Sequence, residues 1–241
     1  MQSPAGIFVT GTDTGVGKTL VAAGLVRLLA AGGQRVVGLK PVASGAERTP
    51  EGLRNADALA LAAASSVELP YETTNPYCFE PAIAPHLAAA DAGVLMSVPT
   101  LVAWYRAATA GVDLAFVEGA GGWRLPLHPA GFLSDFPEAL GLGVILVVGL
   151  RLGCLNHARL TLDAIERSGR CPSLGWIGNA MGPGFPRAAD HLAALEHLLG
   201  SPPLAVIPSL PAATPAHAAS ALQDAARAIG AYTSVDGPSA R

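Results

Sequence analysis

A glycine-rich segment near the amino terminus has the residue types of a phosphate-binding loop. Residues 11–19 read GTDTGVGKT and lie between a β-branched run, Ile7–Thr10, and a stretch of helical composition, Lys18–Ala31. In such a loop, glycines let backbone N–H groups turn inward around phosphate oxygens, and the next helix directs its positive end at the anion. Lys18 would add charge for the outer phosphates, and Thr19 a hydroxyl for Mg²⁺. The segment predicts a nucleotide triphosphate site.

The spacing within this loop departs from the usual form. Five residues, rather than four, separate Gly11 from Gly17. Partition-type ATPases carry a second lysine at the start of the loop, and Asp13 occupies that position here. The loop is therefore a variant form, and Asp13 counts against the partition-type group.

Two acids and a second lysine follow predicted strands or open a predicted helix. Glu118 ends the apolar run DLAFVE and precedes a glycine-rich turn, so it would lie at the edge where parallel sheets bind ligands. Lys40 ends another strand, where a lysine can neutralise charge on a transferring phosphoryl group or be merely solvated. Asp57 lies in the first turn of a helix, where a carboxylate also complements the helix dipole for structural reasons.

The elements that must position these residues alternate between short β-branched runs and longer alanine- and leucine-rich stretches. This alternation predicts an α/β fold of one domain over residues 1–232, with a mostly parallel central sheet and helices on both faces, followed by a flexible tail at 233–241. Residues 66–98 lack periodicity and could shape a substrate pocket. Further strands are expected at Val36–Lys40, Leu114–Glu118, Val144–Val148, Leu174–Asn179 and Leu204–Ile207, and further helices at Asn55–Ser65, Pro99–Ala110, Asn156–Ser168, Arg187–Leu199 and His217–Ala228.

The composition excludes several classes of protein. With 51% hydrophobic and 14% charged residues the chain is typical of a globular protein rather than a disordered one. A net charge of −3 argues against a general nucleic-acid binder. The longest apolar run, Leu140–Leu150, is too short to span a bilayer, and three scattered cysteines fit a reducing compartment. We expect a cytoplasmic protein with no membrane or nucleic-acid partner.

Taken together, these motifs resemble the dethiobiotin synthetase family, and they do so over most of the chain. The KPVxSG and EGAGGW blocks, combined with the GTDTxVGKT loop, are far more specific than a phosphate-binding loop alone. Beyond residue 180 the resemblance weakens. The matching blocks are FVTGTDTGVGKT at 8–19, GLKPVASGAERTPEGLRNADALAL at 38–61, NPYCFEPAIAPH at 75–86, VEGAGGW at 117–123, ILVVGLRLGCLNHA at 145–158 and GWIGN at 175–179.

The resemblance implies a P-loop NTPase-like fold and a specific reaction. 7,8-Diaminopelargonate would take up CO₂, supplied as CO₂ or bicarbonate, on one amine to form a carbamate. ATP would phosphorylate that carbamate to a carbamic-phosphoric anhydride, and the second amine would close the ring to dethiobiotin, releasing ADP and phosphate. Mg²⁺ would be the cofactor and ATP the co-substrate. The family also implies a homodimer with the substrate site at the subunit interface.

The resemblance assigns roles to individual residues. Lys18, Lys40 and Thr14 would be catalytic, and Thr19, Asp57 and Glu118 would hold Mg²⁺. Substrate binding would fall to Ser44, which would hydrogen-bond the carbamate, and to Gly153, Cys154, Leu155 and Asn156, which open a helix that would bind the substrate carboxylate. Asn179 would recognise adenine. Nucleotide binding would further involve Gly15, Val16, Gly17, Lys18, Thr19, Leu20, Asp57, Glu118, Gly119, Ala120, Gly121, Pro208, Ser209 and Leu210.

Two departures and two alternatives accompany this interpretation. Gly15 stands where family members often carry an acidic residue, and residues 211–213 lack a polar residue that the family often supplies near the base. One alternative is a cobyrinate-type amidating synthetase, but the glutamine-dependent members need a glutaminase domain for which the chain has no room. The other is a partition-type switch ATPase, which would show the signature lysine or a terminal amphipathic anchor.

Overall fold

A parallel six-stranded sheet forms the centre of the computed structural model, which describes residues 5–128, 131–182, 184–210 and 214–234. The strands lie in the order β12-β11-β10-β1-β7-β2, so β1 is flanked by β10 and β7. The predicted parallel sheet is confirmed. Its strands are β1 (Ala5–Gly11), β2 (Val36–Leu39), β7 (Leu114–Glu118), β10 (Gly143–Leu150), β11 (Ser173–Ala180) and β12 (Ala205–Ile207).

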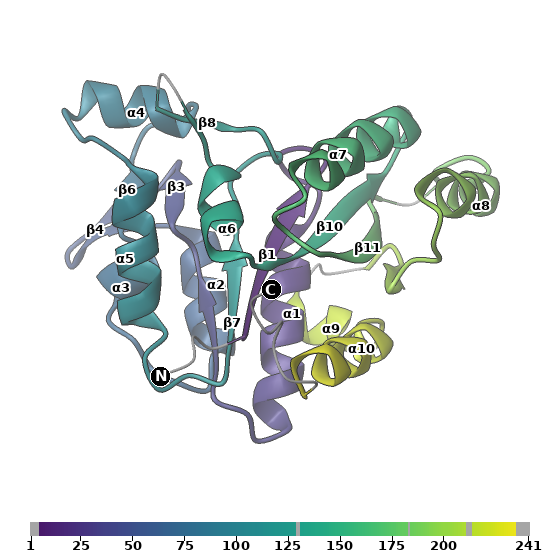
Figure 1. Ribbon diagram of the computed structural model, residues 1–241, viewed down its shortest axis with the longest axis horizontal. Helices are drawn as coiled ribbons and strands as arrows, with labels where there is room; N and C mark the ends of the chain where they lie inside the picture. Colours follow the sequence, from purple (N-terminus) through teal and green to yellow (C-terminus); the bar gives the residue numbers. More distant parts are fainter. Residues whose placement is uncertain (1–4, 129–130, 183, 211–213, 235–241) are drawn as a thin grey trace.

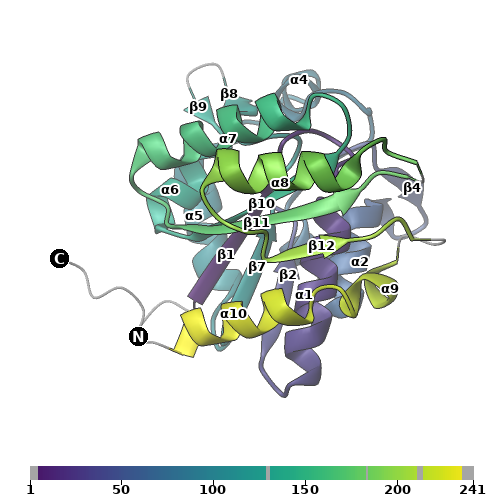
Figure 2. The same cartoon turned by 90° about the vertical axis from the view of Figure 1, so that its right-hand side faces the viewer.

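Helices cover both faces of this sheet, as predicted (Figures 1 and 2). Val9 and Ile145 belong to a core shared with the first group of helices below, whereas Phe8 and Leu146, the neighbouring residues in each strand, belong to cores on the opposite face. This alternation buries both faces of each strand. The first group comprises α1 (Lys18–Ala31), α2 (Ala56–Ala64), α9 (Pro215–Ala219) and α10 (Gln223–Ser234), and the second comprises α5 (Val98–Ala108), α6 (Asp135–Leu140), α7 (Cys154–Ser168) and α8 (Ala188–Leu199).

The carboxyl-terminal helix prediction was wrong in its extent. Instead of one helix over 217–228, the structure has α9 and α10, and α10 continues to Ser234, past the predicted start of the tail. The helix α9 begins early because Thr214 caps it and Pro215 occupies its first turn. Leu222 lies between the two helices and is buried against Gly24 of α1. This contact packs the segment between α9 and α10 onto the core.

Short elements at residues 42–92 and 126–132 extend the chain beyond the central sheet. The segment predicted as irregular, 66–98, contains two short helices and a strand, β6, that pairs in parallel with β3. Two hairpins, β4-β5 and β8-β9, are antiparallel. These elements are β3 (Val42–Ser44), β4 (Glu47–Thr49), β5 (Gly52–Arg54), α3 (Tyr71–Thr74), β6 (Tyr77–Phe79), α4 (Pro85–Asp91), β8 (Pro126–His128) and β9 (Gly131–Phe132).

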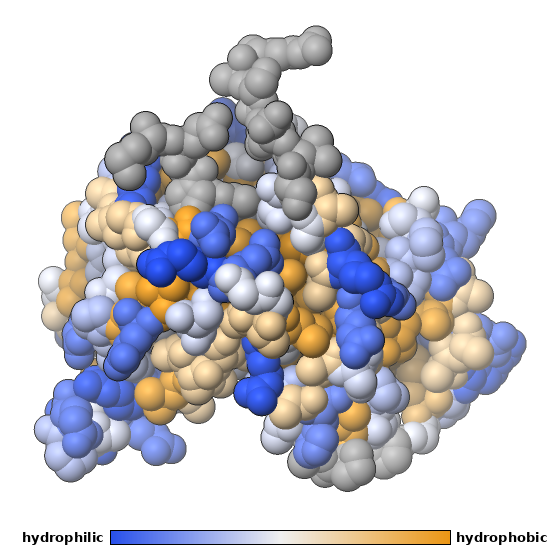
Figure 3. All heavy atoms as spheres, turned by 90° about the horizontal axis from the view of Figure 1, so that it is seen from below, coloured by the Kyte–Doolittle hydropathy of each residue, from blue (hydrophilic) through white to orange (hydrophobic). Residues whose placement is uncertain are grey.

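The surface seen from below in Figure 3 mixes hydrophilic and hydrophobic side chains. Among the described residues, no helix combines the length and the apolar character that crossing a membrane requires.

Candidate active site

The predicted phosphate loop connects β1 to α1 in the strand–loop–helix order that phosphate binding needs. Gly17 caps α1 with a left-handed backbone, φ 98°, and a Cβ there would lie 2.3 Å from the side-chain nitrogen of Asn179. Glycine is therefore required at this position. No side chain caps the start of α1, so its first N–H groups are open to an anion. Gly15 also has a positive φ, 73°, although a Cβ would meet nothing within 4 Å.

Lys18 is folded back onto its own loop. Its side chain is only 6% exposed, and its ammonium donates to the backbone oxygen of Asp13 at 2.9 Å. Burial, and then the positive charge of Lys40, lowers the pKa of Lys18 to about 8. The Asp13 carboxylate accepts from the backbone N–H of Thr14 at 2.7 Å and pairs with Arg151. Asp13 therefore braces the loop, and its backbone oxygen holds the lysine.

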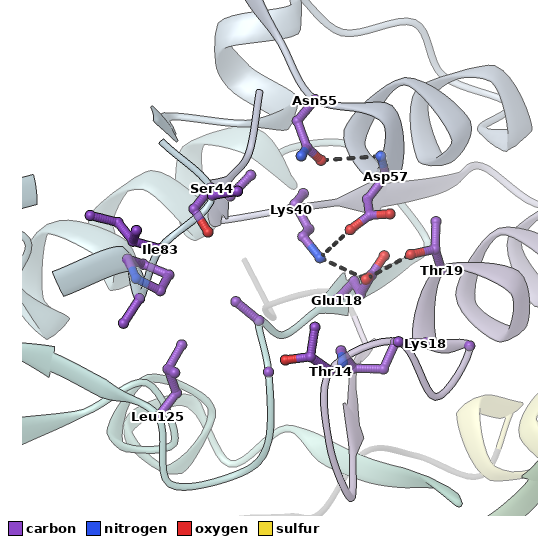
Figure 4. Close-up of a pocket in the computed structure, with 18 of the residues that line it drawn as sticks. Thr14, Lys18, Thr19, Lys40, Ser44, Asn55, Asp57, Ile83, Glu118 and Leu125 are labelled. Atoms are coloured by element: carbon purple, nitrogen blue, oxygen red, sulfur yellow. Dashed lines mark hydrogen bonds and ion pairs between the residues drawn. The ribbon is translucent and has the colours of Figure 1, made fainter. Parts of the chain in front are cut away.

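The three predicted metal ligands lie together with Lys40 in one cluster (Figure 4). The Lys40 ammonium lies 2.6 Å from Glu118 Oε1 and 2.9 Å from Asp57 Oδ2, and it also donates to the backbone oxygen of Gly119 at 3.2 Å. Thr19 donates its hydroxyl to the same Glu118 oxygen at 2.9 Å. Three of these side chains come from β7, α1 and α2, and the fourth, Lys40, directly follows β2, so the parallel sheet brings together residues far apart in sequence.

Electrostatics and hydrogen bonding at this cluster suit a divalent cation. Burial alone would lower the pKa of Lys40, but the Glu118 and Asp57 carboxylates outweigh burial and hold it above its ordinary value. Glu118 is 1% exposed, and its second oxygen, Oε2, is buried with no hydrogen-bond partner among the described residues. An orphaned carboxylate oxygen beside a second carboxylate and a threonine hydroxyl fits Mg²⁺, which takes one or two carboxylates and completes its shell with phosphates and water.

A cavity of about 810 Å³ extends from the phosphate loop past this cluster. Ser44 and Asn55 line it together with Ile83 and Leu125, which lie across from the charged groups in Figure 4. Residues 82–85 contribute to the lining, which supports the hypothesis that the excursion at 66–98 shapes a pocket. Sequence reasoning missed Ile83 and Leu125 as pocket residues, because an apolar side chain in a loop carries no chemical signal.

The predicted substrate and catalytic residues divide into two groups. The cavity lining includes Thr14, Gly15, Gly17, Lys18, Thr19, Leu20, Lys40, Ser44, Asp57, Glu118, Ala120 and Gly121. It does not include Gly153, Cys154, Leu155 or Asn156. Gly153 caps α7 with a left-handed backbone, Cys154 is buried in the core and Asn156 is exposed. In one chain, the proposed carboxylate-binding turn is therefore not part of the cavity.

The predicted adenine-binding residues also lie outside the cavity lining. The Asn179 side chain donates a hydrogen bond to the backbone oxygen of Val16 at 3.0 Å, so it stabilises the phosphate loop. The Val16 side chain is fully buried in the core, which leaves its backbone as the group available to a nucleotide. Pro208, Ser209 and Leu210 follow β12, and residues 211–213 lie outside the described residues. Base recognition by these residues stays a prediction.

Similarity to proteins of known family shows which family this chain belongs to. A family model described as an AAA domain matches residues 5–217. The ATP-dependent dethiobiotin synthetase of Chromohalobacter salexigens is 53% identical over 224 residues, covering 88% of this chain and 94% of that protein. The protein of that name from Cellvibrio japonicus is 46% identical over 223 residues, covering 92% and 97%. The chain belongs to the dethiobiotin synthetase family. The prediction of an ATP-dependent ligase is thereby confirmed.

Structural neighbours outside the dethiobiotin synthetase family share the fold. The septum site-determining protein MinD from Pyrococcus horikoshii superposes with a TM-score of 0.60 at 18% identity, over 94% of this chain and 96% of that one. A MinC–MinD complex from Aquifex aeolicus gives a TM-score of 0.61 at 15% identity, over 98% and 99%. At this level of identity the likeness concerns the P-loop fold alone, which is confirmed.

Proposed function

We propose that this chain uses Mg-ATP to carboxylate 7,8-diaminopelargonate and close it to dethiobiotin. The observation that carries the proposal is the convergence of Lys40, Asp57, Glu118 and Thr19 at one end of a cavity that reaches Ser44. A phosphate loop, a cation site and a second lysine beside an open pocket suit phosphoryl transfer to a bound acid. Relatives named ATP-dependent dethiobiotin synthetase support the choice of substrate.

The chemistry requires three bonds to form in order. One amine of the substrate adds to CO₂ and gives a carbamate with loss of a proton. A carbamate oxygen then attacks the γ-phosphorus of ATP, and ADP leaves. Finally the second amine attacks the carbamate carbon, phosphate leaves with the bonding electrons, and the amine loses a proton to give the cyclic urea. Positioning and charge stabilisation are the main contributions a protein makes to such transfers.

The nucleotide end of the cavity supplies backbone donors and Lys18. The open N–H groups at the start of α1 would receive the phosphates, and the Lys18 ammonium would move from the Asp13 backbone oxygen to the outer phosphates. Thr19, Asp57 and Glu118 would hold Mg²⁺. A bound Mg²⁺ would neutralise charge on the phosphate oxygens.

The carbamate end is defined by Lys40 and Ser44. Lys40 neutralises the two carboxylates, and its ammonium would lie beside the place where carbamate and γ-phosphate meet. With Glu118 and Asp57 serving as cation ligands, Lys40 would stabilise the negative charge that develops during transfer. Ser44 would hydrogen-bond the carbamate, and Thr14 would lie over the phosphates.

A second copy of the chain would complete the substrate site. Gly153–Asn156 lie outside the cavity of their own chain, while the Gly153 turn leaves the start of α7 without a side-chain cap. We infer a homodimer in which this turn binds the substrate carboxylate in the partner's cavity. Leu152 and Leu160, beside the turn and on α7, are 88% and 59% exposed and would be covered in such a dimer.

Substrate-dependent ADP release tests the proposal. Purified protein would be given Mg-ATP, bicarbonate and 7,8-diaminopelargonate, with ADP followed by a coupled assay and dethiobiotin by mass spectrometry. We expect one ADP for each dethiobiotin, and no ADP when either the diamine or bicarbonate is omitted. Well-folded protein that releases no ADP in response to the diamine would contradict the proposal.

The same assay separates the alternative functions. A switch ATPase would release ADP without the diamine, and an amidating synthetase would require a nitrogen donor in place of bicarbonate. Either pattern would replace the proposed reaction. As a matched variant, Ser44→Ala should raise the KM for the diamine while leaving the KM for ATP unchanged, because Ser44 lies away from the phosphate loop.

A further inference from the structure

A tyrosine outside the cavity lining joins the two segments that carry Lys40 and Asp57. The hydroxyl of Tyr71, in α3, accepts a hydrogen bond from the backbone N–H of Asn55 at 2.7 Å. It donates a hydrogen bond to the side-chain oxygen of Asn75 at 3.1 Å. The Asn75 side chain in turn donates to the backbone oxygen of Lys40 at 2.7 Å. One hydroxyl is thus shared between the end of β2 and the start of α2.

Each end of this chain of hydrogen bonds acts on a residue of the proposed site. On one side, Asn55 caps α2 by accepting from the backbone N–H of Asp57 at 3.1 Å, which fixes the backbone of Asp57 in the first turn of the helix. On the other, both backbone polar groups of Lys40 are bound to the end of α3 and the residue after it, since its N–H donates to the oxygen of Thr74 at 2.8 Å and its oxygen accepts from Asn75. Asn75 and Thr74 are each 2% exposed.

The tyrosine is held from several sides. The Arg54 guanidinium lies 4.2 Å from the centre of the Tyr71 ring, and the Trp104 side chain donates to the Thr73 oxygen at 2.8 Å. Burial raises the pKa of Tyr71 to about 12, so the hydroxyl stays protonated and able to donate. A rigid support of this kind is what a transfer reaction needs, because small displacements of charged groups weaken transition-state stabilisation.

We propose that Tyr71 and Asn75 are positioning residues, which set the distance between the Lys40 ammonium and the Asp57 carboxylate for phosphoryl transfer. The inference rests on the proposed function for its catalytic meaning, but its structural content is independent of the substrate. Tyr71 touches neither the phosphate loop nor the pocket, so its effect must pass through the backbone of Lys40 and the cap of α2.

A spectroscopic test uses the fact that Lys18 and Lys40 are the only lysines in the sequence. Full-length protein labelled with ¹³C at the lysine Cε carbons should give two lysine resonances, assigned with Lys18→Arg and Lys40→Arg variants. In Tyr71→Phe, which keeps the ring but removes the hydroxyl, we expect the Lys40 resonance to shift and the Lys18 resonance to stay near its original position. Tyr77→Phe is the matched control, because the described residues show no hydrogen bond to the Tyr77 hydroxyl, and it should move neither signal.

A kinetic test measures the catalytic consequence. Tyr71→Phe should lower kcat by about ten- to a hundredfold, the range expected for a small misplacement of catalytic groups. Calorimetric titration with ADP should show an unchanged number of binding sites per chain and an unchanged Kd, because the phosphate loop is untouched. A purely structural role would instead lower kcat and the number of binding sites in equal proportion.

A second variant acts at the other end of the same chain of hydrogen bonds. Asn75→Ser should lower kcat as Tyr71→Phe does, and the double variant should be no worse than the more severe single one, because both break one connection. A Lys40 resonance unmoved in both variants would overturn the inference, as would wild-type kcat in both. Failure of the wild-type protein to release ADP would contradict the proposed function instead, and the lysine spectra would still decide the positioning role.

Discussion

Lys40 is the buried positive charge between the two carboxylates of the proposed site. Its ammonium contacts both Asp57 and Glu118, and the Glu118 carboxylate is buried. Lys18 lies close enough for its pKa to be lowered by the Lys40 charge. At the residue scale, the site is therefore a balance of two lysines and two carboxylates, and removing one member changes the stability as well as the activity.

The first prediction concerns Lys40→Ala. Turnover should be abolished, and the ligand-free protein should lose about 3 to 5 kcal/mol of stability, because a buried carboxylate is left uncompensated. Mg-ADP should recover more stability in the variant than in the wild type, since a bound cation would replace the lost charge. Thermal melts with and without Mg-ADP measure both effects.

Arg227→Ala is the control for Lys40→Ala. The Arg227 side chain is 72% exposed and pairs with Asp224 on α10, so its loss should change stability little and activity not at all. Near-normal turnover in Lys40→Ala would mean that the reacting groups meet elsewhere.

Helix starts do much of the positioning at the element scale. The helix α1 begins at the phosphate loop, and α2 begins at Ala56 with Asp57 in its first turn, so both place their positive ends near the cavity. Asn55 caps α2 with its side-chain oxygen and also lines the cavity. Asp57 is both a first-turn acid, as predicted from the sequence, and a member of the charged cluster.

The element-scale prediction compares two helix caps. Asn55→Ala and Ser97→Ala each remove a side chain that accepts from helix N–H groups, in α2 and α5 respectively. Each should cost about 1 kcal/mol in urea unfolding. Only Asn55→Ala should also lower kcat and raise the Mg²⁺ concentration needed for half-maximal activity, because only α2 carries a proposed ligand. Equal kcat in the two variants would show that the start of α2 does not position the site.

The whole molecule raises the question of how many chains make one site. The cavity gathers the residues proposed to bind phosphate, metal and carbamate, but Gly153–Asn156 lie outside its lining. For the proposed reaction, a single chain would therefore supply the groups for phosphoryl transfer but not the turn proposed to hold the far end of the substrate. In a symmetric dimer, the Gly153–Asn156 turn of each chain would reach the cavity of the other chain.

The dimer prediction is tested by complementation. Light scattering after size-exclusion chromatography should give a molar mass twice the chain mass of 24.3 kDa. Lys40→Ala and Asn156→Ala should each be impaired alone, yet co-expressed chains should recover about one quarter of wild-type activity, because half of the dimers would be mixed and each would hold one intact site. A monomer, or no recovery in demonstrably mixed dimers, would contradict the shared site.

Local patterns in the sequence determined the parts of this protein that depend on neighbouring residues. The order of strands and helices follows from the alternation of β-branched and alanine-rich runs, and the phosphate loop from Gly17, Lys18 and Thr19 between β1 and α1. Lys40 and Glu118 could be placed at the same sheet edge because parallel strands end there together. The specific family blocks then indicated the reaction class, which the relatives confirm at the level of the family.

Only the tertiary structure decided which of those residues meet, because contacts between segments far apart in sequence leave no local pattern. The ion pair between Lys40 and Glu118 spans 78 residues of sequence. The hydrogen bonds through Tyr71 join the end of β2 to the start of α2, and no local sequence pattern predicts that connection. The apolar pocket wall at Ile83 and Leu125, and the break between α9 and α10, depend on packing against the rest of the chain. Packing also places Gly153–Asn156 outside the cavity of their own chain. The test of a shared site is therefore whether a second chain supplies this turn.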